Sequence, residues 1–181
     1  DLVLLVLDAS EPLSSQDLQL GGLLERHSRS TIIVLNKWDL SDDVSDTHRN
    51  AVMEKIYRYF PHLKFAPIVF VSGKTGYRVH QIFPLITQVQ KARETLVDSR
   101  ELDDFLHEVV REHRPARGKG TRHPDLIGLR QLGASPPVFE LFIKYRTSLH
   151  LSYVHFLENK LRERFNFFGT PIVIKLTKMK R

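Results

Sequence analysis

The chain has 181 residues, enough for one domain or two small ones, and 41% of them are apolar, which excludes a chain that is disordered throughout. It contains no cysteine, which excludes disulfides, thiolate catalysis and cysteine-ligated zinc. The longest strongly apolar run, Leu2–Leu7, is far shorter than the roughly 20 residues of a membrane-spanning helix, and no signal segment is present. The composition therefore favours a soluble, cytoplasmic protein with no membrane partner.

Charge is divided unevenly along the chain. Residues 1–98 carry 11 Lys and Arg against 12 Asp and Glu, a net charge of −1, whereas residues 99–181 carry 16 against nine, a net charge of +7. A near-neutral part followed by a basic part predicts two modules with different partners. Basic surface attracts nucleic-acid phosphates, but many basic proteins bind none, so charge alone leaves RNA contact open.

Residues 1–98 alternate between strand and helix patterns. The expected strands, rich in Val, Ile and Leu as in strands buried on both faces, are Leu2–Leu7, Ile32–Leu35 and Ile68–Val71. The first expected helix runs from Ser14 or Ser15 to about His27, with Leu20, Leu23 and Leu24 on one face. The second runs from about Thr47 to Phe60, and the third follows Tyr77. Pro84 predicts a late start or a kink in the third helix. This α/β order predicts parallel βαβ units, with ligands bound at the carboxyl ends of the strands.

The first polar motif at such a strand end is Asn36-Lys37-Trp38-Asp39. Guanine presents N1–H and N2–H₂ as neighbouring donors, and one carboxylate, that of Asp39, can accept from both in a charge-assisted pair. Adenine lacks this donor pair, so a buried carboxylate would be left unpaired against it. Asn36 can link neighbouring loops and face the N7/O6 edge of the base, and the stem of Lys37 can lie over the base. The alternative is an ordinary polar turn, in which Asn and Asp are common.

A second motif, Ser72-Gly73-Lys74, follows the third expected strand. Its backbone N–H groups can donate to guanine O6, Gly73 permits a close backbone approach, and Lys74 can flank the other face of the base. Two such motifs at neighbouring strand ends favour guanine recognition over the polar-turn alternative. Asp8, at the end of the first expected strand, is expected to form a turn.

Other catalytic chemistry is not indicated. A phosphate-binding G-x-x-x-x-G-K-[ST] loop would need glycine where Ile68 stands, and no histidine pair has the spacing of a helical metal site. Gly73-Lys74-Thr75-Gly76 spells a KH-type GxxG, but it follows a strand, whereas the KH loop joins two helices. We therefore expect no catalytic residue and no metal ligand in this chain, and no GTP hydrolysis by the chain alone.

Residues 99–181 show an α-β-β-α-β order. Asp98 or Ser99 can cap the first helix, and the later elements are expected at Leu126–Leu132, Val138–Tyr145, Leu149–Phe165 and Pro171–Leu176. The aromatic residues fit the spacing of a core, so they do not indicate a stacking surface. The candidate RNA or ribosome contacts are the basic residues Arg114, Arg117, Lys119, Arg122, Lys178, Lys180 and Arg181. A solvated charge run is the alternative for the stretch from Arg114 to Arg122.

Together these segments resemble the Der (EngA) family of GTPases. The resemblance is carried by DLVLLVLDAS, VLNKWDL, APIVFVSGKTG, VHQIFPLI, SRELDDFL, PPVFELFIK, LSYVHFLENKLRERF and FGTPI, which extend over essentially the whole chain. It implies the last three strands of a Ras-like P-loop GTPase sheet, from the second of two tandem G domains, over residues 1–98, and a KH-like domain over residues 99–181. The chain is then expected to be part of a longer protein and to begin inside that G domain.

The resemblance also implies function. Asn36, Lys37 and Asp39 match the family's NKxD motif, and Ser72, Gly73 and Lys74 match its SAK motif with Gly73 in place of alanine. The intact protein is expected to bind GTP and GDP, to hydrolyse GTP with Mg²⁺ held outside this chain, and to act in large ribosomal subunit assembly. Asp125-Leu126-Ile127-Gly128 departs from the family's basic and aromatic strand. Two alternatives are an Era-type GTPase with a true KH domain and a non-catalytic RNA- or protein-binding module.

Overall fold

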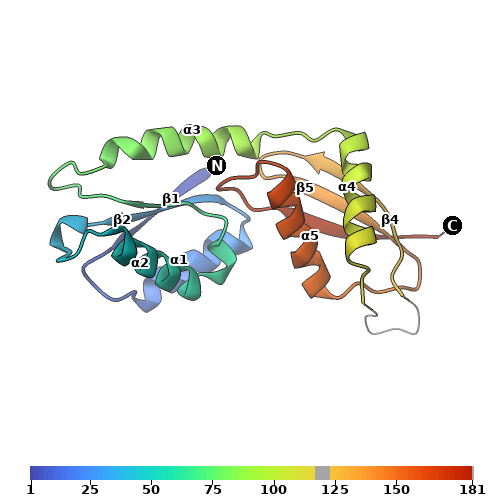
Figure 1. Cartoon of the computed structure of the whole chain (residues 1–181), viewed down its shortest axis with the longest axis horizontal. Helices are drawn as coiled ribbons and strands as arrows, with labels where there is room; N and C mark the ends of the chain where they lie inside the picture. The colour runs from blue at the N-terminus through green and yellow to red at the C-terminus, as the bar shows by residue number, and fades with distance from the viewer. Residues whose placement is uncertain (117–122, 181) are drawn as a thin grey trace. The chain divides into compact units, whose positions relative to one another are not determined.

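The computed structural model describes residues 1–116 and 123–180 (Figure 1). The chain forms two compact units, the first made of Asp1–Arg93 and Phe168–Pro171, the second of Glu94–Phe167 and Ile172–Arg181. The boundary expected after residue 98 falls close to this division. No sequence pattern indicated that four residues near the C-terminus would belong to the first unit.

The first unit is built on a parallel sheet of three strands in the order β1-β2-β3. Its elements are β1 (Leu2–Asp8), α1 (Ser15–Arg26), β2 (Ser30–Asn36), α2 (Asp46–Tyr59), β3 (Ile68–Phe70) and α3 (Ile82–Arg93). Helices α1 and α2 cover one face of the sheet and α3 the other, as Figure 1 shows. The expected α/β order with parallel strands is confirmed.

Helix starts follow the expected chemistry. Ser14 caps α1, since its hydroxyl accepts from the Asp17 N–H at 3.2 Å while the Asp17 carboxylate accepts from the Ser14 N–H at 2.8 Å. A single 3₁₀ turn, η3 (Val79–Gln81), precedes α3. Pro84 therefore lies in the first turn of α3, where its missing N–H costs little, and the late helix start is confirmed.

Two expectations about burial in the first unit are wrong. Leu4 and Val6 of β1 are 37% and 56% exposed, because β1 is an edge strand and only Leu2 of this strand joins the apolar cluster under α3. On α1, Leu20 and Leu23 are also exposed. The buried residue there is Gly21, where an added Cβ would lie 2.5 Å from the Phe60 ring, so the helix packs through a glycine rather than a leucine stripe.

Residues 168–171, here called the return segment, pack against the start of β2. The Thr31 N–H donates to the Gly169 carbonyl at 3.0 Å, and the Gly169 N–H donates to the Phe65 carbonyl at 3.2 Å. The Ser30 hydroxyl donates to Thr170 Oγ1 at 2.8 Å in a buried position. Gly169 has φ +68°, a backbone conformation that favours glycine. The segment therefore satisfies backbone groups at the amino end of β2.

The second unit has the expected α-β-β-α-β order. Its elements are α4 (Ser99–Glu112), β4 (Leu126–Gly133), β5 (Val138–Lys144), α5 (Leu151–Arg164) and β6 (Val173–Met179). Strand β5 is central, antiparallel to β4 and parallel to β6. Helices α4 and α5 pack on one face of this sheet, and Asp98 caps α4 (Figure 1).

The other face of the second sheet carries charged side chains. Along β5, Phe139, Leu141 and Ile143 are buried under the helices, and Glu140 lies on the opposite face. Glu140 accepts from the Thr177 hydroxyl at 2.5 Å and pairs with Arg130 at 2.6 Å, and these two contacts lower the pKa of its carboxyl. Among the residues that the structure describes, no helix combines the length and the apolar composition needed to cross a membrane.

Candidate functional site

The two polar motifs lie together at the carboxyl edge of the first sheet. Strands β2 and β3 are neighbours, with Leu35 opposite Phe70, so the loops that follow them meet. Asn36 Oδ1 accepts from the Gly73 N–H at 2.9 Å, and the Trp38 N–H donates to the Val71 carbonyl at 3.0 Å. Asn36 thus joins the two loops, as the sequence predicted.

A cavity of about 330 Å³ lies between these loops. It is lined by Asn36, Lys37, Asp39, Leu40, Gly73 and Lys74. Its volume is at the lower end of the range for small-ligand sites. Five of the six residues predicted for base recognition line it. Leu40 was not among them, although its place directly after the first motif could have indicated it.

Asp39 presents its carboxylate at the wall of this cavity. It lies in a single 3₁₀ turn, η1 (Trp38–Leu40), and is exposed. Within residues 1–116 and 123–180, no side chain or backbone group donates a hydrogen bond to its carboxylate. Both carboxylate oxygens can therefore accept from a ligand.

Lys37 forms an ion pair with Asp8, a residue that the sequence predicts only to form a turn. Its backbone is left-handed, with φ +62°, and its Nζ lies 2.6 Å from Asp8 Oδ2 at the end of β1. Asp8 also accepts from the Ser10 N–H at 2.9 Å, so the expected turn forms. Asp8 lies opposite Asn36 in the β1–β2 register, and that pairing was the signal that could have predicted the contact.

The ion pair changes the titration of both groups. The hydrogen bond from Lys37, followed by those from Ser10, lowers the pKa of Asp8 to about 2. Asp8 in turn raises the pKa of Lys37. Asp8 stays ionised at neutral pH, and it holds the Lys37 side chain at one side of the cavity.

Ser72 shapes its loop and does not line the cavity. Its side chain is buried, its N–H donates to the Tyr77 carbonyl at 3.0 Å, and its hydroxyl accepts from the Thr75 N–H at 3.1 Å. The Gly73 N–H is bonded to Asn36. Of the three amides predicted to reach guanine O6, that of Lys74 has no backbone or side-chain acceptor in the described part of the chain.

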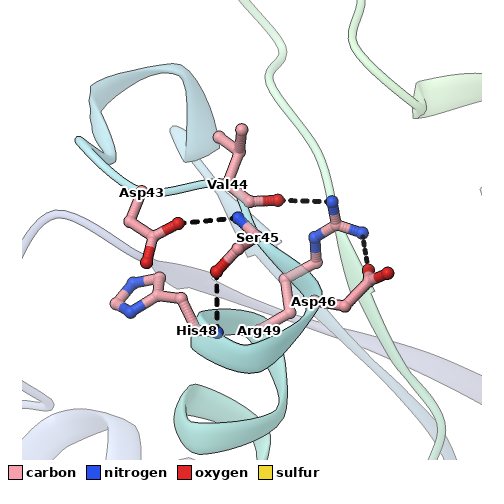
Figure 2. A network of polar contacts seen from close by, with 6 residues as sticks. All are labelled: Asp43, Val44, Ser45, Asp46, His48 and Arg49. Atoms are coloured by element: carbon pink, nitrogen blue, oxygen red, sulfur yellow. Dashed lines mark hydrogen bonds and ion pairs between the residues drawn. The ribbon is translucent and has the colours of Figure 1, made fainter.

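The chain after Asp39 is fixed by a polar network at the start of α2, shown in Figure 2. The Ser45 hydroxyl accepts from the His48 N–H at 3.2 Å, the Ser45 N–H donates to Asp43 at 2.8 Å, and Arg49 pairs with Asp46 at 2.8 Å. The His48 ring stacks on the buried Trp38 at 5.6 Å between centroids. Trp38 is therefore packed in the interior beside His48, and it is not among the residues that line the cavity.

Comparison with known proteins gives this arrangement a family. Residues 97–177 match the family model of the KH-domain-like domain of EngA bacterial GTPase enzymes, C-terminal. GTPase Der of Caldanaerobacter subterraneus subsp. tengcongensis is 35% identical over 178 residues, and GTPase Der of Listeria monocytogenes is 38% identical over 180 residues. The chain belongs to the Der (EngA) family.

The match extends over nearly all of this chain but only part of its relatives. It covers 98% and 99% of the chain, and 40% and 41% of the two Der proteins, so the chain spans about two fifths of their length. A solved structure of Aquifex aeolicus Era bound to GDP.AlF4- shares 14% identity with a TM-score of 0.42, covering 98% of this chain and 65% of that one.

The basic residues predicted to contact RNA are placed only in part. Arg114 follows α4, while Lys178 belongs to β6 and Lys180 follows it, and all three are exposed. Arg117, Lys119, Arg122 and Arg181 lie outside the described residues. Within the described ranges, no group of three or more acidic or histidine side chains could hold a metal ion.

Proposed function

We propose that this chain supplies the guanine-reading end of a GTP-binding domain and a basic KH-like unit, within a cytoplasmic GTPase that acts in assembly of the large ribosomal subunit. The observation that carries the proposal is the cavity between the two joined loops, with Asp39 on its wall. Membership of the Der family supports the wider activity, since the relatives are named GTPase Der.

The cavity residues divide the work of recognising guanine. The Asp39 carboxylate accepts from N1–H and N2–H₂, and the amide of Lys74 donates to O6. The aliphatic stems of Lys37 and Lys74 cover the two faces of the base, and Asn36 holds the loops at its N7/O6 edge. Adenine presents an acceptor in place of the N1–H donor, so it would leave the Asp39 carboxylate unpaired.

On this proposal, residues outside this chain bind the phosphates of the nucleotide. The likeness to Der proteins supports a Mg²⁺ ion and phosphates held by other residues of the intact G domain. Mg²⁺ supplies charge neutralisation at the phosphates during hydrolysis. The contribution of this chain is to select and orient the base, and the chain alone does not turn over GTP.

A titration of the ¹⁵N-labelled chain with GMP, IMP and AMP tests base reading directly. GMP should shift the amide signals of Asp39, Gly73 and Lys74 at millimolar concentrations, IMP should bind more weakly because it lacks the N2 amine, and AMP should not bind. Asp39→Asn should lose GMP and gain XMP, because its side-chain amide then donates to the C2 carbonyl of xanthine and its side-chain carbonyl accepts from N1–H.

The matched control is Asp42→Asn, which removes an exposed carboxylate from the same loop but outside the cavity lining. It should leave the base preference unchanged. Equal shifts with GMP and AMP, or a preference that Asp39→Asn does not move, would refute guanine recognition.

The ribosomal part of the proposal rests on the basic second unit. Residues 99–181 carry a net charge of +7, and Lys178 and Lys180 are exposed at one end of its sheet. Co-sedimentation of the chain with isolated large and small ribosomal subunits, over a series of salt concentrations, should show preferential and salt-sensitive binding to the large subunit. Binding that ignores ionic strength or favours the small subunit would contradict it.

A further inference from the structure

An exposed aromatic ring with two cations lies at the end of β5. Tyr145 directly follows the strand and is 42% exposed. The Arg146 guanidinium carbon lies 5.7 Å from the centre of the Tyr145 ring, and Lys180 Nζ lies 5.1 Å from it. These three residues are called the Tyr145 cluster below. The spacing of the aromatic residues in this unit predicts core positions for them, and the exposed Tyr145 is an exception.

The backbone around the cluster is held in place. The Tyr145 N–H donates to the Met179 carbonyl at 2.8 Å, which extends the β5–β6 ladder past the last residue of β5 and sets Lys180 beside the ring. The Thr147 hydroxyl donates to the Lys144 carbonyl at 2.6 Å, and Arg146 between them adopts a left-handed backbone with φ +61°. The ring is therefore presented at the surface by a fixed turn, which lowers the entropy cost of using it in binding.

The positive charge of the cluster is not neutralised locally. Lys144 has a carboxylate, that of Asp125, 3.9 Å away. Arg146, Lys178 and Lys180 form no ion pair with any residue in the described ranges 1–116 and 123–180. Their contacts with the Tyr145 ring are weak at an exposed site and can be exchanged for contacts with an anion.

We infer that the Tyr145 cluster binds single-stranded RNA, with one base stacked on the Tyr145 ring and the flanking phosphates held by Arg146 and Lys180. The inference rests on the proposed function, in which the basic unit contacts RNA, and it adds a site that reads the flat face of a base. Unpaired bases stack on aromatic side chains, and every base has such a face, so no sequence preference is required. An acidic peptide would pair with the cations but would leave the ring unused.

The test compares two ligands that differ only in the bases. The 181-residue chain is titrated with a fluorescent ten-nucleotide oligouridylate and with an abasic oligonucleotide of the same length, which keeps the phosphates. The unchanged chain should bind oligouridylate about tenfold more tightly than the abasic strand, a ratio within the range for one stacked base. Tyr145→Leu should abolish that difference without weakening abasic binding, and Tyr145→Phe should retain it.

The cations are tested by salt dependence. Arg146→Gln and Lys180→Gln should weaken the binding of both ligands and reduce the salt slope by about 0.7 each, as expected for one lost phosphate contact on a single strand. Tyr77→Leu is the matched control, because Tyr77 is also exposed and has an arginine, Arg78, 5.2 Å from its ring, but lies in the near-neutral first unit. It should change neither ligand's affinity.

The outcomes separate this inference from the broader proposal. Salt-dependent binding of oligouridylate that Tyr145→Leu leaves unchanged would overturn the stacking site and leave RNA contact by the unit standing. If neither strand binds the chain at 50 mM salt, both fail. If Tyr145→Leu weakened polyglutamate binding as much as oligouridylate binding, the ring would not act through base stacking, and the inference would also be overturned.

Discussion

The central strands of the two sheets, β2 and β5, are buried in different ways. Residues Ser30–Leu35 of β2 are all buried, because helices cover both faces of the first sheet. Strand β5 alternates, with Phe139, Leu141 and Ile143 buried and the residues between them only partly so. A sheet enclosed on both faces leaves only its strand ends for chemistry, whereas a sheet covered on one face leaves a whole surface for charged side chains. The cavity lined by Asp39 follows this difference, whereas the Tyr145 cluster also lies at a strand end, that of β5.

Alanine substitutions at consecutive positions should reproduce the contrast and give the largest effects. Ile32 and Ile33 of β2 are each fully buried on opposite faces, so Ile32→Ala and Ile33→Ala should each lower the free energy of unfolding by about 2–5 kcal/mol. In β5, Leu141→Ala should cost as much, but Phe142→Ala, at a half-buried position, only about 1–2 kcal/mol.

Urea denaturation with two probes can measure these changes. Trp38 is the only tryptophan in the sequence, and its ring centre lies 4.4 Å from that of Phe70, so its fluorescence reports on the first unit. Amide hydrogen exchange along β5 reports on the second. A Phe142→Ala cost equal to that of Leu141→Ala would show that the outer face of the second sheet is covered, which would break the comparison.

The return segment gives the next largest effect. An added Cβ at Gly169 would lie 2.3 Å from Val89 Cγ2, and the residue has φ +68°. Gly169→Ala should therefore lower the free energy of unfolding of the first unit by about 2–4 kcal/mol, through backbone strain and overpacking together. Trp38 fluorescence during denaturation measures it.

Gly76 provides the control for Gly169. Its φ is +80°, but no atom lies within 4 Å of an added Cβ. Gly76→Ala should cost only the backbone strain, about 1 kcal/mol. Equal costs for the two substitutions would mean that the return segment is not packed against Val89.

A pair of adjacent glycines in α1 should show opposite signs. At Gly21 an added Cβ meets the Phe60 ring at 2.5 Å, so Gly21→Ala should destabilise the first unit by about 1–3 kcal/mol. At Gly22 nothing lies within 4 Å, so Gly22→Ala should stabilise the helix by about 0.5–1 kcal/mol. Thermal denaturation of both variants is sufficient, and a stabilising Gly21→Ala would show that α1 does not lie close to Phe60.

Local sequence patterns predicted the helices and strands, but not which of their residues pack most closely against one another. The period of apolar residues located every helix and strand named above, and capping chemistry placed the starts of α1 and α4. The burial of Gly21 in place of Leu20 and Leu23 depends on how near the backbone of α1 comes to Phe60, which no hydrophobic pattern encodes. The return segment is separated by more than 100 residues from the strand it meets, so only the tertiary fold could reveal it.

The candidate site shows the same division. The motif residues Asn36, Asp39 and Gly73 were predictable because parallel strands bring their carboxyl ends to one edge. The contact between Asp8 and Lys37 required the β1–β2 register, and the Tyr145 cluster required the pairing of β5 with β6. Side chains that meet through register rather than through sequence spacing were the ones that reasoning from the chain alone missed.

The smallest expected effect concerns the ion pair at the strand ends. Hydrogen bonds from Lys37 and, to a smaller extent, from Ser10 lower the pKa of Asp8 to about 2, from an unfolded value near 3.9. A carboxyl whose pKa is depressed on folding stabilises the folded state above its unfolded pKa, and that contribution is lost as the pH falls from about 4 toward 2. The stability difference between the unchanged chain and Asp8→Asn should therefore be constant above about pH 5 and shrink below pH 4.

NMR titration of the Asp8 carboxyl carbon measures this directly. Its midpoint should lie near pH 2 in the unchanged chain and rise in Lys37→Met, because the hydrogen bond from Lys37 is the largest cause of the lowered pKa. Some depression should remain, since Ser10 still donates to the carboxylate. A midpoint that Lys37→Met leaves unchanged would show that the hydrogen bonds from Ser10 alone lower the pKa of Asp8. The strand ends of the enclosed sheet would then lack the side-chain link on which the position of Lys37 in the cavity depends.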